Sequence, residues 1–186
     1  LIYRSSKFPY YLLFIISFPI VLFCKEVLSI WLVNVPDYAV VITQLVIITS
    51  FTEALSAPLW TAIGATGKVQ KYQLLVSLII FLNVPLVYVA FKLGMSPIAA
   101  FVINFVVSVF AYLYRLLYIK KYVPYHLGDY LKKVVLPCVI VTVLSFPIPY
   151  IFREYAISAI STILLLVLTI VVTGIVILLT GLDMNE

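Results

Sequence analysis

Few residues in the sequence could carry out chemistry, and they do not form a catalytic set. The chain of 186 residues contains one histidine, His126, and two cysteines, Cys24 and Cys138. A metal site needs three or more ligands, and nucleophilic catalysis needs a base beside the nucleophile. The sequence also has no glycine-rich phosphate loop and no paired carboxylates. We therefore expect a protein without a metal, a cofactor or enzyme activity.

The one acidic residue deep inside a long apolar stretch is Glu53. It belongs to a helical stripe of small and polar side chains, whose members are three, four or seven residues apart. They are Thr43, Ser50, Glu53, Ala54, Ala57, Thr61 and Gly64. A membrane-buried acid costs about 2.5–3.5 kcal/mol, while the ten Leu, Ile, Val and Phe residues at positions 40–59 gain about 3–6 kcal/mol. The helix inserts with little margin, so Glu53 is expected to face protein or water.

Two interpretations of Glu53 stay open. It could line a cavity, where it would couple to protons or cations or contact a substrate, or it could be a structural hydrogen-bonding partner of Asn83 or Asn104. Asn104 belongs to a second polar stripe, which Arg115 ends at the membrane surface. That stripe consists of Pro97, Ala100, Asn104, Ser108, Ala111 and Arg115. Glu53, Asn83, Asn104 and Arg115 are therefore the candidate residues of a substrate path.

The composition defines the elements that must position these residues. Hydrophobic residues make up 65% of the chain and charged residues 10%, and the mean hydropathy is +1.23. Soluble domains contain about 45–50% apolar and about 25% charged residues. These values exclude a soluble domain and a disordered chain, and the apolar runs do not alternate as barrel strands do. We predict an all-α, polytopic membrane helix bundle that forms one domain over residues 1–186. Its six transmembrane helices are expected at 8–24, 39–63, 73–91, 98–117, 134–152 and 156–180.

The basic residues predict the orientation of the bundle. Nine of the 12 Lys and Arg residues fall before the first span, between the second and third, or from the end of the fourth to the start of the fifth. The positive-inside rule therefore places both termini in the cytoplasm, and it explains the net charge of +5 without a nucleic acid. Four of these residues are candidates for binding an anionic headgroup, although topogenesis alone would also place them there: Lys68, Lys71, Lys120 and Lys121.

The remaining features concern helix shape and packing. Proline removes a backbone donor, so we expect broken or bent helices at Pro9, Pro19, Pro85, Pro137, Pro147 and Pro149. The last span is nearly all Leu, Ile and Val and is predicted to be peripheral and lipid-facing, interrupted at Thr169, Thr173 and Gly174. Cys24 and Cys138 are expected at opposite depths of the bilayer, too far apart for a disulfide.

Several segments resemble the polysaccharide flippases of the multidrug, oligosaccharidyl-lipid and polysaccharide exporter superfamily. They are residues 19–31 (PIVLFCKEVLSIW), 35–38 (VPDY), 57–72 (APLWTAIGATGKVQKY) and 83–85 (NVP). The pattern Ala-Thr-Gly-Lys-x-x-x-Tyr is the most specific piece. The resemblance covers about residues 8–120, and the last two spans match only in being hydrophobic.

The resemblance implies alternating access that moves an undecaprenyl-diphosphate-linked oligosaccharide across the bacterial inner membrane, in the synthesis of surface polysaccharide such as lipopolysaccharide O-antigen. It implies the C-terminal portion of a protein with 12 to 14 helices. The implied partners are the lipid-linked substrate, membrane lipids, the N-terminal helices of the same polypeptide and a polysaccharide polymerase. The spans 8–24, 39–63 and 98–117 are expected to line the path. The alternatives are a cation-coupled multidrug exporter of the same superfamily and a non-transport membrane subunit.

Overall fold

The computed structural model describes residues 2–67, 69–122, 126–152 and 159–181, and within these residues the structure is helical, without a strand. The elements, where η marks a π-helix, are α1 (Ile2–Leu22), α2 (Cys24–Trp31), α3 (Ala39–Ala65), α4 (Val69–Phe81), α5 (Asn83–Lys92), α6 (Ile98–Ile119), α7 (Leu127–Tyr130), η1 (Leu131–Val135), α8 (Leu136–Ser145), α9 (Pro147–Ile151), α10 (Ala159–Val176) and η3 (Ile177–Gly181).

Six helical segments are long and apolar enough to cross a membrane, which confirms the predicted bundle and makes the chain a multi-pass membrane protein. The segments are Tyr3–Leu22, Ala39–Ala65, Val69–Lys92, Ile98–Ile119, Leu127–Ile151 and Ile160–Thr180. The fifth differs most from the prediction, because it begins at Leu127 rather than at position 134 and so includes Lys132 and Lys133. The start predicted for the sixth, at position 156, lies outside the described residues.

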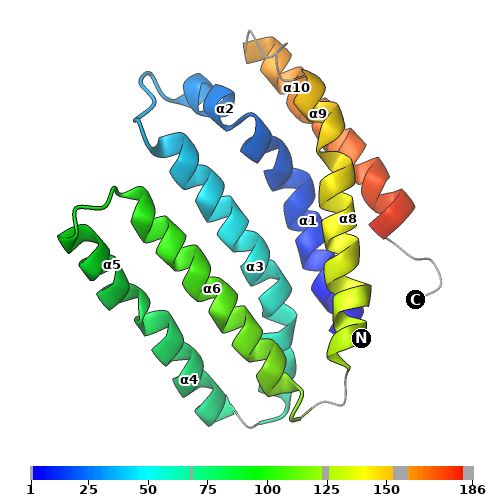
Figure 1. Ribbon diagram of the computed structural model, residues 1–186. Helices are drawn as coiled ribbons and strands as arrows, with labels where there is room; N and C mark the ends of the chain where they lie inside the picture. The colour runs from blue at the N-terminus through cyan, green and yellow to red at the C-terminus, as the bar shows by residue number, and fades with distance from the viewer. Residues whose placement is uncertain (1, 68, 123–125, 153–158, 182–186) are drawn as a thin grey trace.

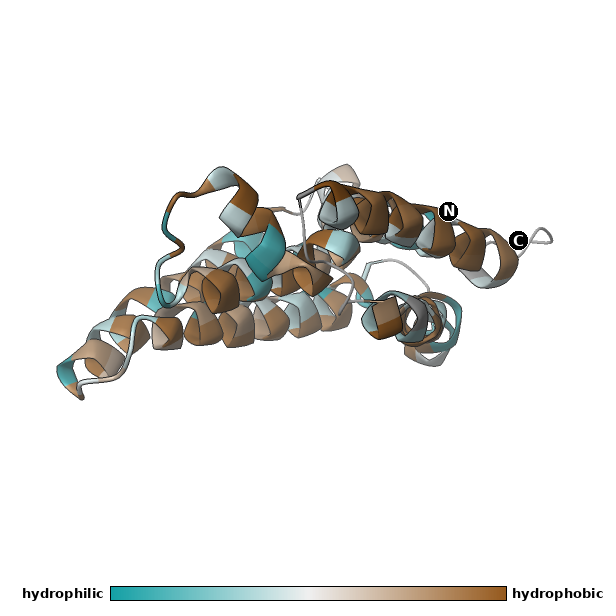
Figure 2. Cartoon of the chain, turned by 90° about the horizontal axis from the view of Figure 1, so that it is seen from above, coloured by the Kyte–Doolittle hydropathy of each residue, from teal (hydrophilic) through white to brown (hydrophobic). Residues whose placement is uncertain are grey.

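Helix α3 is the central element of the bundle. It packs against α1 on one side and α6 on the other, and α6 in turn contacts α4 and α5 (Figure 1). Helices α8, α9 and α10 pack beside α1, away from α4 and α5. Seen along the bundle, the helices are apolar over most of their length (Figure 2). Polar side chains within the spans are therefore the exceptions whose placement needs an explanation.

Prolines break some of the helices and leave others continuous. Pro85 has no N–H to pair with the Phe81 carbonyl, and the third span is divided there into α4 and α5 at Leu82. In the fifth span, the π-helical turn η1 comes just before Pro137, and α8 ends at Ser145, before Pro147. Helix α1 instead runs through Pro9 and Pro19 without a break.

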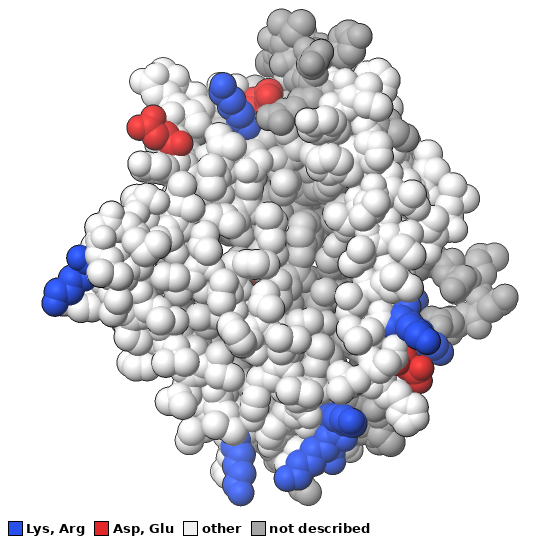
Figure 3. Space-filling model, viewed as in Figure 1, with Lys and Arg blue, Asp and Glu red and all other residues white. Residues whose placement is uncertain are grey.

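The two ends of the bundle differ in charge. One end carries the start of α1, the connection from α3 to α4 and the end of α6; the other carries α2 and the connection from α5 to α6 (Figure 1). Lys and Arg side chains gather at the first end, which we call the basic end (Figure 3). The described residues that contribute them are Arg4, Lys7, Lys71, Lys120, Lys121, Lys132 and Lys133. This distribution is the one on which the predicted orientation rests, and the orientation itself stays a prediction.

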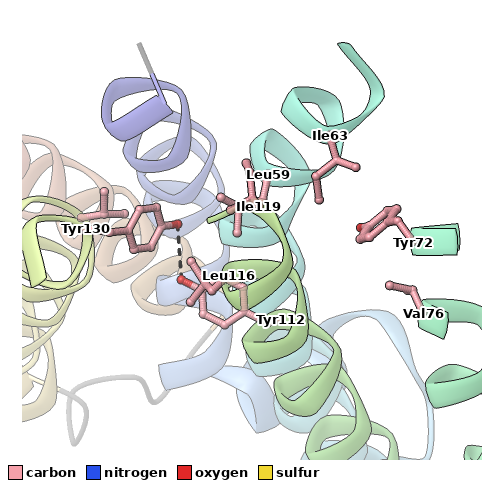
Figure 4. Packing of buried hydrophobic residues seen from close by; sticks show 9 residues of the cluster. Leu59, Ile63, Tyr72, Val76, Tyr112, Leu116, Ile119 and Tyr130 are labelled. Carbon is pink, nitrogen blue, oxygen red and sulfur yellow. Dashed lines mark hydrogen bonds between the residues drawn. The ribbon is translucent and has the colours of Figure 1, made fainter. Parts of the chain in front are cut away.

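A hydrophobic cluster at the basic end holds α3, α4, α6 and α7 together (Figure 4). Leu59, Ile63 and Tyr72 are fully buried in it, and the hydroxyl of Tyr112 donates a hydrogen bond of 3.3 Å to that of Tyr130. In a second cluster the aromatic rings of α1 pack against residues of α8 and η3. Both cysteines are buried and free, as the sequence predicts.

The last span shows how polar residues are placed in this bundle. Most of its Leu, Ile and Val side chains are exposed, in agreement with a lipid-facing helix. Thr162, Thr169 and Thr173 are buried, because they lie on the face that packs against the rest of the bundle. The hydroxyl of Thr169 donates to the Leu165 carbonyl at 2.7 Å, which satisfies it within its own helix.

Candidate functional site

Glu53 and Arg115, two of the four residues predicted for a substrate path, line the same cavity. Glu53 lies near the middle of α3, about 18 Å along the helix from Ala65 at 1.5 Å per residue. The cavity has a volume of about 40 Å³ and lies between α3, α4 and α6. Its lining consists of Thr52, Glu53, Ser56, Ile80, Ser108, Ala111 and Arg115. It has room for one or two water molecules among several polar groups.

Arg115 is directed into the bundle by a contact between two helices. Its Nη1 atom donates a hydrogen bond to Oγ of Ser56 on α3. A side chain on a helix leans toward the N-terminus of that helix, and the N-terminus of α6 lies at the end opposite the basic end. Ser56 is about 14 Å along α3 from Ala65, and Arg115 only about 6 Å along α6 from Ile119. The guanidinium therefore reaches toward the membrane interior instead of extending to the surface.

The charge of Arg115 is not fully satisfied by the protein. Within the part of the chain that the structure describes, its Nε is buried without a hydrogen-bond acceptor, and it has no carboxylate within 4.0 Å. A cation in a membrane span costs about 2.5–3.5 kcal/mol on insertion scales, so an uncompensated one calls for a counter-charge or water. A guanidinium with free donors is well suited to bind an oxyanion such as a phosphate.

A larger groove extends the cavity toward α4. It has a volume of about 340 Å³, which falls in the range of small-ligand pockets, about 300–1,000 Å³. Its lining is Glu53, Ala57, Trp60, Tyr72, Gln73, Val76, Ile80 and Arg115. Tyr72 is fully buried, and its hydroxyl points away from α4 toward α3 and α6 (Figure 4). Among the described residues that hydroxyl makes no hydrogen bond of good geometry, but it interacts with the guanidinium of Arg115, so the two polar groups face the groove together.

Asn83 and Asn104, the other two predicted path residues, pair with each other. Nδ2 of Asn83, the first residue of α5, donates to Oδ1 of Asn104 on α6 at 3.1 Å. Neither residue lines the cavity or the groove that Glu53 lines. The structural alternative, in which Glu53 bonds one of these amides, is therefore not what the structure contains. The amide pair joins α5 to α6 across the break at Leu82.

The cavity and the groove are lined by other helices than those expected to line a substrate path. The lining residues of both spaces lie on α3, α4 and α6, corresponding to the second, third and fourth spans. Helix α1 packs on the other side of α3 and contributes no side chain to them. The first span was expected to line a substrate path, whereas the third, apart from Asn83, was not.

Three of the basic residues predicted to bind an anionic headgroup are described. Lys71 lies in the first turn of α4 and lines a separate cavity of about 400 Å³ with Tyr118 and Tyr122. Lys120 and Lys121 follow α6 and are exposed, and neither lines that cavity. Lys68 lies outside the described residues.

Ser56 of the cavity and Tyr72 of the groove were missed in the sequence. Ser56 lies three residues after Glu53, one helical turn on the same face, which was a usable signal. Tyr72 ends the segment that carries the resemblance, but its burial and the position of its hydroxyl depend on how α4 packs against α6, which no local pattern indicates.

No family model, curated protein or solved structure matches the chain. The resemblance to the polysaccharide flippases therefore stays a prediction from the residues that carry it.

Proposed function

We propose that the protein is a transporter that moves an undecaprenyl-diphosphate-linked oligosaccharide across the bacterial inner membrane by alternating access. The observation that carries the proposal is the shared cavity of Glu53 and Arg115, because both are ionisable residues within membrane spans. Such residues are expensive in a bilayer and face a substrate path or a partner group. A packing role does not explain why Arg115 reaches inward to Ser56 and leaves Nε unsatisfied.

The arrangement suits an anionic, amphipathic substrate. Arg115 supplies a cation with free donors for a diphosphate, Tyr72 supplies a hydroxyl, and the groove leads along α4. Glu53 provides a group that can exchange a proton or a cation with the path. Bond making or breaking is not part of the proposal, and the work of the protein is to bind the substrate and to change shape.

The broken helices support the change of shape that alternating access requires. Helices interrupted at membrane depth occur in transporters, where they form binding sites and allow one half to move against the other. The break at Leu82 lies beside Ile80, which lines both the cavity and the groove. Motion at this break would therefore change the width of the path.

A pair of cell assays tests the proposal. In the full-length protein, Glu53→Gln and Arg115→Ala should each lower the amount of surface polysaccharide, while the controls Asp37→Asn and Arg4→Ala, which change exposed charges away from the cavity, should leave it unchanged. If the variants instead make cells more sensitive to drugs with polysaccharide unchanged, the exporter of the same superfamily is the correct function. If neither the surface polysaccharide nor the drug sensitivity changes, the chain is a non-transport subunit.

A further inference from the structure

A second cavity lies at the basic end of the bundle, apart from the space that Glu53 and Arg115 share. It has a volume of about 400 Å³, again in the range of about 300–1,000 Å³ for small-ligand pockets. Its lining is Gly67, Val69, Gln70, Lys71, Tyr118 and Tyr122. None of these residues lines the cavity or groove of the candidate substrate path. The proposed function therefore leaves this cavity without a role.

The rings in this cavity belong to a larger tyrosine cluster. Tyr114 and Tyr118 on α6 and Tyr122 in the turn after it follow one another every four residues, with ring centroids 5.8 and 5.3 Å apart. The ring of Tyr72 lies 5.4 Å from that of Tyr118, and the hydroxyls of Tyr118 and Tyr122 are 3.4 Å apart, within hydrogen-bond distance. The rings are tilted by 39–45° relative to one another and hold each other in place, so the cavity has an aromatic wall that is formed in advance.

The rest of the lining comes from the turn between α3 and α4 and from the start of α4. Gly67 has a positive φ of 68°, a conformation that other residues adopt at a cost, and it allows the chain to turn from α3 into α4. Gln70 and Lys71 follow within the first turn of α4 and line the cavity with an amide and an ammonium group. Lys120 and Lys121, at the end of α6, add positive charge near Tyr122.

We propose that this cavity binds the phosphorylated saccharide head of a glycolipid at the membrane surface, before the head reaches Arg115. The tyrosine rings offer an apolar face to the C–H face of a pyranose, Gln70 and the hydroxyls bond its hydroxyl groups, and Lys71 binds the phosphate. A simple anionic phospholipid would use the lysine and not the rings. The proposal rests on the proposed function for the direction of transfer, but the binding site itself can be tested separately.

The chain contains a matched control at the opposite end of the bundle. Tyr88 and Lys92 on α5 also place an exposed ring next to an ammonium group, with Nζ 6.0 Å from the ring centroid. Neither residue lines any of the cavities described above. Tyrosines are enriched at both membrane surfaces for reasons unrelated to ligands, and this pair reports that general effect.

The test is a binding measurement on the full-length protein in nanodiscs of phosphatidylcholine. The probe is a short-chain isoprenyl-diphosphate disaccharide, compared with inorganic pyrophosphate and with nanodiscs that contain phosphatidylglycerol. Tyr122→Leu and Lys71→Gln should each raise the Kd for the probe about tenfold, which corresponds to about 1.4 kcal/mol. Tyr88→Leu and Lys92→Gln should change it less than twofold.

Each other outcome has a definite meaning. If Tyr122→Leu binds the probe as the unaltered protein does, the rings do not hold a saccharide and the inference is wrong. It is also wrong if pyrophosphate or phosphatidylglycerol displaces the probe as well as the unlabelled saccharide does, because the site then recognises phosphate alone. Loss of surface polysaccharide in Arg115→Ala with unchanged binding in Tyr122→Leu would refute this inference and leave the proposed function standing. Tenfold weaker probe binding in Tyr122→Leu, together with normal surface polysaccharide in Arg115→Ala, would support this inference and refute the proposed function.

Discussion

Arg115 of α6 donates a hydrogen bond from Nη1 to the side-chain oxygen of Ser56 on α3. This contact joins the two helices that pack most extensively on one side of the bundle, and it fixes a cation beside the cavity that Glu53 lines. Arginines near the ends of membrane helices usually extend to the surface, where water solvates the charge. Here the side chain points the other way, which is the geometry expected of a group that meets a ligand inside the membrane.

The first prediction concerns the energy of this contact. Ser56→Ala should lower the free energy of unfolding in detergent by about 1.5–3 kcal/mol, because a hydrogen bond to a charged group is lost. In a double-mutant cycle with Arg115→Ala, the two changes should be far from additive. Ser50→Ala is the matched control, since its hydroxyl donates only to the Val46 carbonyl of its own helix. Additive effects of Ser56→Ala and Arg115→Ala would contradict the contact.

The second prediction concerns the break between α4 and α5. Pro85→Ala restores a backbone donor for the Phe81 carbonyl and should join the two helices into one. We expect a higher melting temperature, because a backbone hydrogen bond is gained. We also expect a transport rate several-fold lower, because the third span can no longer bend at Leu82. Pro97→Ala, at the N-cap of α6, removes a proline without restoring a helix and should leave the rate unchanged. A normal transport rate in Pro85→Ala would show that the break has no part in the mechanism.

The third prediction concerns the thiol of Cys24, which lies outside the membrane-spanning segments and is 1% exposed. Burial raises the pKa of Cys24 above the usual range, and the charge of Glu26 adds to the shift, while a hydrogen bond with Thr43 opposes it. At a given pH the thiolate fraction is therefore smaller than for an exposed cysteine. Two variants, both with Cys138 replaced by Ala, are compared: one keeps Cys24, and the other has Cys24 replaced by Ser and carries Ser29→Cys. Labelling of Cys24 by a small uncharged maleimide should rise at a higher pH than labelling of the thiol at position 29. Identical pH profiles would contradict the shift.

The fourth prediction concerns orientation. With both native cysteines replaced, Ser29→Cys on α2 and Lys132→Cys on η1 place single thiols at opposite ends of the bundle, both at exposed positions. A membrane-impermeant maleimide added to intact cells should label Ser29→Cys and should reach Lys132→Cys only after the cells are permeabilised. The reversed pattern would place the basic end outside and overturn the orientation predicted from the charges.

How far the sequence could be read differs between the fold and the site. Apolar runs of suitable length are local, so the six spans could be predicted, and Pro85 indicated the break in the third span. Pro9 and Pro19 carried the same signal but leave α1 continuous, where Phe14 and Phe18 are buried in the cluster that packs α1 against α8 and η3. A proline predicts a lost hydrogen bond and does not by itself predict where a helix ends.

The candidate site was only half visible in the sequence. Glu53 and Arg115 could be singled out because charge is rare within the spans, and a helical stripe is a local pattern. Their meeting at one cavity, and the pairing of Asn83 with Asn104 instead of with Glu53, depend on how α3, α5 and α6 are rotated about their axes. A stripe marks the polar face of one helix, but it does not indicate which neighbouring helix that face meets.

The most direct test of the central claim is translocation of a lipid-linked oligosaccharide in proteoliposomes that contain the full-length protein. The account predicts that Arg115→Ala lowers the initial rate at least about tenfold, because a charge-assisted contact with the diphosphate is lost. Arg115→Lys should retain part of the rate, and Arg4→Ala, which removes an exposed arginine from the same end of the bundle, should match the unaltered protein. Equal rates for Arg115→Ala and Arg4→Ala would contradict the assignment of the cavity between α3, α4 and α6 as the substrate path.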